Sequence, residues 1–76
     1  MGLRQTQNVK NLLILLDDTS TANVTYIGQA AIGSDRTQAV WQIKKVDETS
    51  GTVITFADGD ANFDNIWNNR TSLTYS

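Results

Sequence analysis

Apolar and polar residues alternate along much of the chain, which is typical of β-strands that bury one face. Residues 23–32 alternate in this way, and one face carries Val24, Tyr26, Gly28, Ala30 and Ile32. The glycine within this strand predicts a bulge or a close approach of another group to the backbone at Gly28. The continuous apolar run Leu12–Leu16 suits either a doubly buried strand or one or two turns of helix, because periodicity cannot separate them.

The clearest predicted element is a β-hairpin formed by residues 37–47 and 52–58, with residues 48–51 as a loop that ends in glycine. If these residues form the loop, Asp47 lies opposite Thr52. The pairs that follow are then Val46 with Val53, Lys45 with Ile54, Lys44 with Thr55, Ile43 with Phe56 and Trp41 with Asp58. In this register one face of the hairpin carries the core cluster Trp41, Ile43, Ile54 and Phe56.

The last part of the chain predicts a short helix that covers the sheet. Four residues at positions i, i+3, i+4 and i+7 form a helical stripe, namely Phe63, Ile66, Trp67 and Arg70. We expect the helix over about residues 61–68, with Asp60 as its N-cap and with Phe63 and Trp67 packed on the sheet. A short strand over residues 71–75 follows.

Together these elements predict a mainly β fold. We expect a small antiparallel β meander, or a partly open barrel, of four or five strands with one short C-terminal helix. We divide the chain into an N-terminal arm and docking strand over residues 1–20 and a β domain over residues 21–76. An open sheet of this size leaves unpaired edges, which closure or a neighbouring subunit would cover.

The composition removes most catalytic chemistry. The chain has no histidine and no cysteine, so it offers no imidazole base and no thiol nucleophile. Serine and threonine are abundant, but none has a base beside it. We therefore expect no enzymatic activity, no catalytic residue and no cofactor.

Three aspartates form the one dense acidic group, at Asp58, Asp60 and Asp64. Their spacing resembles the start of a calcium-binding loop, since calcium takes oxygen ligands. Asn69 stands where such a loop needs a closing bidentate carboxylate. A turn followed by a helix cap explains the three residues more simply, so we expect no metal site.

The charges and the apolar runs also narrow the range of partners. The net charge is −2, with six basic and eight acidic residues, and only Lys44 and Lys45 are adjacent bases. A nucleic-acid binder needs a basic face. The longest apolar run, Leu12–Leu16, is far shorter than the roughly 20 residues of a membrane span. We expect neither nucleic acid nor a membrane as a partner.

Two groups of residues are candidates for binding a protein partner or a sugar. They are the apolar run Leu12, Leu13, Ile14, Leu15 and Leu16, and the two tyrosines Tyr26 and Tyr75. An edge strand can pair with a strand of another subunit, although the same run could be ordinary core. The predicted hairpin and helix assign both tryptophans to the core, which leaves the tyrosines as surface aromatics that could stack on a sugar.

Several short motifs occur in a distinctive order. They are YIGQA at 26–30, AVWQIKK at 39–45, GT at 51–52, FADG at 56–59 and FDNIW at 63–67, followed by Arg70, Leu73 and Tyr75. This series resembles a set of small proteins encoded by tailed bacteriophages and prophages, and it covers roughly residues 24–75. Members of that set are mostly labelled uncharacterised or as virion components. The resemblance implies a phage context and a particle component, and it carries over no binding or catalytic residue.

These observations favour a structural component of a bacteriophage virion. A multi-copy capsid decoration or cement protein is the first hypothesis, and a tail, neck or baseplate protein is the alternative. A small glycan- or protein-binding module is a further alternative. The expected partners are other virion proteins and copies of the chain itself, and the expected location is the virion, with the host cytoplasm during assembly.

Overall fold

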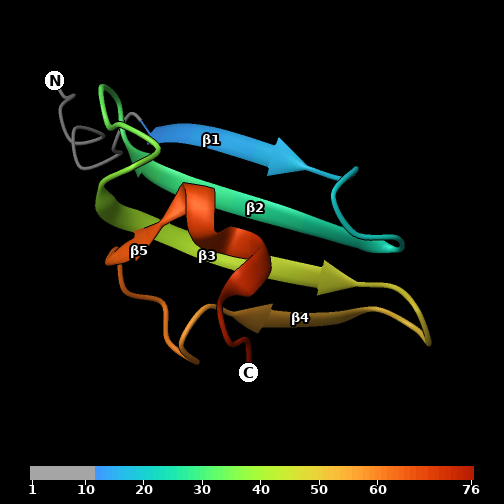
Figure 1. The fold of residues 1–76 in the computed structure, drawn as a ribbon. Coiled ribbons are helices and arrows are strands. Elements are labelled where there is room, and N and C mark those ends of the chain that lie inside the picture. Colours follow the sequence, from blue (N-terminus) through green and yellow to red (C-terminus); the bar gives the residue numbers. More distant parts are fainter. Residues whose placement is uncertain (1–11) are drawn as a thin grey trace, which may run out of the picture.

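The computed structural model describes residues 12–76, which form an open antiparallel sheet with a 3₁₀ helix on one face (Figure 1). The elements are β1 (Leu12–Asp17), β2 (Val24–Ala31), β3 (Ala39–Asp47), β4 (Val53–Phe56), β5 (Asn65–Ile66) and the helix η2 (Trp67–Ser72). Strands β1 to β4 are neighbours in chain order, and β5 pairs with the first part of β3. The predicted β meander with a short C-terminal helix is confirmed, and the sheet does not close into a barrel.

Strand β2 is one of the two interior strands of the sheet, and its alternation is as predicted. Val24, Tyr26 and Ala30 are buried, whereas Ile32 lies beyond the end of the strand and is exposed. The Leu12–Leu16 run forms most of β1, a strand rather than a helix, and pairs with β2 along its whole length. Residues 1–11, the first part of the predicted arm, lie outside the described residues.

The core lies between the sheet and η2. Trp41 and Ile43 of β3 are fully buried, and the Trp67 ring of η2 packs against Trp41 with 6.1 Å between centroids. Trp67 also lies directly over Gly28, where an added Cβ would be 2.5 Å from Cε3 of the ring. The close approach predicted at Gly28 is therefore confirmed, because only a residue without a side chain leaves room for this indole.

The predicted register of the hairpin is wrong by one residue. Asp47 pairs with Val53 instead of Thr52, and each later pair shifts in the same way: Val46 pairs with Ile54, Lys45 with Thr55 and Lys44 with Phe56. The Asp47 carboxylate accepts the Thr49 N–H at 2.9 Å, and Gly51 adopts a φ of +103°. The turn therefore takes in Thr52 as well, and Ile54 and Phe56 point away from the face that carries Trp41.

The predicted bounds of the helix, 61–68, are also wrong. The helix is a 3₁₀ helix that begins at Trp67, because Asn65 and Ile66 pair with β3 instead. Asp60 caps no helix, since its carboxylate accepts the Asn62 N–H in a turn at 3.0 Å. Trp67 packs on the sheet as predicted, whereas Phe63 does not join the core and is exposed.

The strand expected over residues 71–75 is reduced to a short tie between the C-terminus and β4. Tyr75 forms an isolated antiparallel bridge with Ala57. Phe56 and Ser76 exchange both backbone hydrogen bonds, each at 3.2 Å. The C-terminal residues therefore pair with part of the edge of β4 that faces away from β3.

An ion pair joins the last residue of β1 to η2. The Arg70 Nε donates to the Asp17 carboxylate at 2.8 Å, and the Arg70 guanidinium lies 4.5 Å from the centroid of the Trp67 ring. The backbone N–H groups of Thr19 and Ser20 also donate to Asp17, at 3.0 and 3.1 Å. The Ser20 hydroxyl, the Thr19 N–H and Arg70 hold the pKa of this buried carboxyl well below its ordinary value.

Replacing Gly28 by alanine should destabilise the fold by about 1–3 kcal/mol, because the new methyl group meets the indole of Trp67. Urea denaturation followed by tryptophan fluorescence measures this loss. Thr25→Ala, on the opposite face of the same strand, is the control and should cost less than about 1 kcal/mol. Equal stability of Gly28→Ala and the natural chain would contradict the contact between Trp67 and Gly28.

Replacing Asp17 by asparagine should lower stability at neutral pH by about 1–3 kcal/mol, since Arg70 and the turn N–H groups lose a charged acceptor. The folded pKa of Asp17 lies below the ordinary value of 3.8, so its contribution is present above that pH and is lost as the pH falls below it. The stability difference between the natural chain and Asp17→Asn should therefore narrow in acid. Asp18→Asn, at the exposed neighbouring position, is the control, and a gap that stays constant with pH would contradict this role.

Candidate assembly surface

The face of the sheet opposite η2 is formed by side chains that no other part of residues 12–76 covers, apart from the loop around Phe63. In Figure 1, η2 lies in front of the sheet, so this face is on the far side. We call it the outer face. It comprises Leu12, Ile14 and Leu16 of β1, Thr25, Ile27, Gln29 and Ala31 of β2, Val40, Gln42, Lys44 and Val46 of β3, and Ile54 and Phe56 of β4. None of these residues is buried.

The outer face is mainly apolar. Its polar members are Thr25, Gln29, Gln42 and Lys44, and it carries no carboxylate. Ile14, Leu16 and Ile54 are among the most exposed large apolar side chains of the described residues. Single exposed apolar residues are ordinary, whereas a contiguous set on one sheet face is typical of surfaces that bind another group.

Cross-strand pairing arranges the outer face in four rows. The first row contains Leu12, Ala31 and Val40, and the second contains Ile14, Gln29 and Gln42. The third row contains Leu16, Ile27, Lys44 and Phe56, and the fourth contains Thr25, Val46 and Ile54. The first and fourth rows therefore lie at opposite ends of the face.

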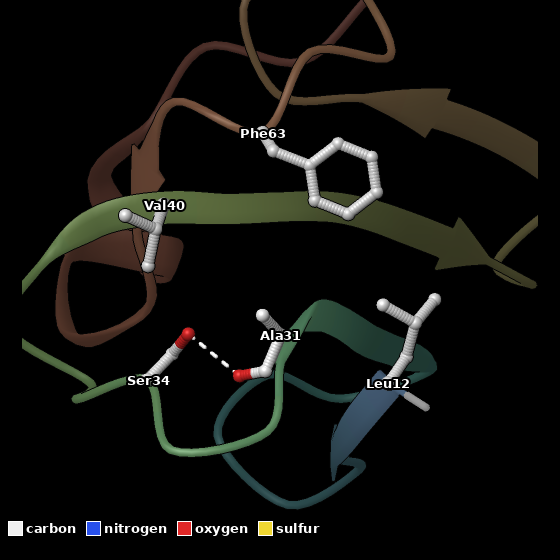
Figure 2. Close-up of a pocket in the computed structure, with 5 residues that line it drawn as sticks. All are labelled: Leu12, Ala31, Ser34, Val40 and Phe63. Atoms are coloured by element: carbon white, nitrogen blue, oxygen red, sulfur yellow. Dashed lines mark hydrogen bonds between the residues drawn. The ribbon is translucent and has the colours of Figure 1, made fainter. Parts of the chain in front are cut away.

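The first row contains a hollow of about 480 Å³ (Figure 2). Leu12, Ala31 and Val40 line it from three strands, and the ring of Phe63 closes it from the loop before β5. The one polar side chain at its rim, Ser34, donates from its hydroxyl to the Ala31 carbonyl at 2.7 Å. The hydrogen of that hydroxyl is already bonded and the other lining side chains are apolar, so the hollow suits an apolar side chain.

The single charge on the outer face is held against an aromatic ring. The Nζ atom of Lys44 lies 5.8 Å from the centroid of Phe56, its cross-strand partner. Lys44 is half-buried, so its aliphatic stem lies along the sheet while the ammonium group stays accessible. The charge of Lys44 therefore lies beside Phe56 within the third row.

The predicted partner-binding run is divided between the two faces. Leu12, Ile14 and Leu16 lie on the outer face, whereas Leu13 and Leu15 pack against the core. The core interpretation of the run therefore holds for Leu13 and Leu15. Partner binding by the outward residues stays a prediction.

The two tyrosines do not form a surface platform. Tyr26 is only 5% exposed, so its prediction as a surface aromatic is wrong. Tyr75 packs on it with 5.8 Å between ring centroids and donates its hydroxyl to the Arg70 carbonyl at 2.7 Å. Burial raises the pKa of Tyr75, and the neighbouring Tyr26 adds to this effect. Both rings serve packing on the covered face.

Sequence reasoning misses most of the outer face. Ile27, Val40 and Val46 alternate with the core residues of β2 and β3, and this alternation is visible in the sequence. The predicted hairpin register assigns Ile54 and Phe56 to the core, and its error of one residue hides them. In the structure the loop between β3 and β4 is one residue longer than predicted, which places Ile27, Val40, Val46, Ile54 and Phe56 on the same face.

Other kinds of site find no support in the described part of the chain. Within residues 12–76 no group of three or more aspartate or glutamate side chains is placed to hold a metal ion, so Asp58, Asp60 and Asp64 do not form a joint site. Among the same residues no helix has the length and apolarity to cross a bilayer.

The outer face is thus the candidate functional surface, formed by four strands and hollowed at one end. Comparisons of the chain with protein-family models, curated proteins and solved structures gave no significant match.

Proposed function

We propose that the chain is a structural component of a bacteriophage virion, most simply a capsid decoration or cement protein. The observation that carries this proposal is the outer face, a mainly apolar sheet surface without a carboxylate. A protein that works by assembly needs a surface of this kind, whereas a free monomer gains nothing from exposing it. The motif series from Tyr26 to Tyr75, which resembles small phage proteins, supports the phage context.

The small size of the domain also supports assembly. A chain of this length buries a smaller fraction of its surface on folding than a larger domain does, and this one has no cysteine for a disulfide. Its core is limited to one tryptophan pair and a few neighbours between the sheet and η2. Binding to a particle would therefore add stability that the isolated chain lacks.

Mass spectrometry of purified particles of the phage that encodes this chain tests the proposal. We expect the protein in the particles in many copies, as for a component repeated over the capsid. A few copies per particle would favour the tail, neck or baseplate alternative. Absence from purified particles would overturn the proposal.

A pair of variants tests whether the outer face holds the protein in the particle. Leu16→Lys, on the outer face, should reduce incorporation at least tenfold, because it places a charge in an apolar contact. Ile32→Lys, outside the strands, is the matched control, since Ile32 is 67% exposed and Leu16 is 68% exposed. Equal incorporation of both variants would exclude the outer face as the attachment surface.

A further inference from the structure

We infer that the outer face binds a second copy of the chain, face to face, in a two-fold symmetric β-sandwich. This inference rests on the proposed function, because it names the partner of the same surface. Three properties of the face support a copy of the chain as its occupant: its area, the arrangement of its rows and its charge.

The area of the outer face suits a weak dimer. The outer face has thirteen strand positions, because β4 is absent from the first and second rows and β1 from the fourth. At about 4.8 Å between strands and about 6.6 Å between rows, these positions cover about 400 Å² per copy, so two copies bury about 800 Å² in projection, which is in the range of weak, transient interfaces. The face is therefore large enough for a dimer that forms reversibly.

The four rows are self-complementary about one axis. A two-fold axis that runs between the two sheets, across the strands and between the second and third rows, places the first row of one copy over the fourth row of its partner. Each strand then lies over the same strand of the other copy in the opposite direction. Stacked sheets pack in this way at about 10 Å, with strand directions offset by about 30°.

This axis brings the hollow of one copy to the protruding end of the other. Phe63 and Val40, at the hollow, lie over the exposed Ile54 and over Val46 of the other copy. Because the contact is isologous, the same fit occurs twice. In the middle rows Ile14 lies over Leu16 of the other copy.

The same axis does not stack the two lysines directly on each other. Lys44 of one copy lies over Gln42 of the other, so the only cation of the face meets an amide. The face has no carboxylate for a basic partner, and its one cation, Lys44, lies 5.8 Å from the ring of Phe56. The acidic groups that give the chain its net charge of −2 lie outside this face, so two copies meet there without acidic repulsion.

Sedimentation equilibrium of the full chain, at concentrations up to about 1 mM, measures the dimer. We expect a reversible monomer–dimer equilibrium. Ile54→Lys should weaken it at least about 30-fold, because two lysines enter the apolar contact. Val53→Lys is the matched control, since Val53 is the neighbouring residue, is also 56% exposed and faces the opposite side. Circular dichroism melts of both variants verify that each is folded.

Mixing two variants tests the proposed axis directly. Ile14→Lys and Leu16→Glu should each dimerise poorly alone, because each homodimer holds two unpaired charges. In the mixed dimer the introduced lysine of one copy faces the introduced glutamate of the other, while the second contact keeps the natural Ile14 and Leu16. The mixture should therefore form more dimer than either variant alone.

A natural chain that stays monomeric at every concentration would overturn the inference, and so would equal dimerisation of Ile54→Lys and Val53→Lys. A mixture of Ile14→Lys and Leu16→Glu that forms no more dimer than its components would overturn the arrangement about this axis. Particle incorporation without a dimer would overturn the inference and leave the proposed function intact. Dimer formation by a chain that is absent from purified particles would overturn the proposed function and leave the inference intact.

Discussion

The fold depends on the contact between Trp67 and the bare backbone of Gly28. A four-stranded open sheet has no second layer of its own, and η2 supplies one by placing a single indole over the interior strand β2. The indole also packs against Trp41. The guanidinium of Arg70 lies over the Trp67 indole and donates a hydrogen bond to the Asp17 carboxylate. Trp67 therefore packs directly on the sheet, and Arg70, which lies over its ring, links η2 to Asp17 at the end of β1.

That contact also explains why the two faces of the sheet differ so much. The C-terminal segment is long enough to cover one face, and it buries Trp41, Ile43 and Tyr26 there. The other face keeps a comparable supply of apolar side chains on the same strands without a cover from residues 12–76. A small sheet with two apolar faces and one short helix leaves one face without a second layer from residues 12–76, and this is the basis for proposing that the chain works in an assembly.

The sequence predicts the strands well because alternation is a local signal, and β2 shows it with buried Val24, Tyr26 and Ala30. It fails where a backbone detail decides the outcome. The positive φ of Gly51 and the Asp47 side chain set the turn length, and neither changes the apolar pattern that suggests the register. The spacing of Phe63, Trp67 and Arg70 suggests an α-helix. Instead, Asn65 and Ile66 pair with the part of β3 that β4 leaves unpaired. Both errors concern long-range or turn geometry, and together they hide the outer face.

The turn between β3 and β4 also indicates how such a surface could arise during evolution. Side chains alternate along β4, so a change of one residue in loop length exchanges which of them meet Trp41 and which meet solvent. A single-codon insertion or deletion there can therefore convert an inward pair such as Ile54 and Phe56 into an outward one without altering either residue. Which apolar side chains reach the outer face is thus encoded in the length of a loop as much as in the identity of the side chains.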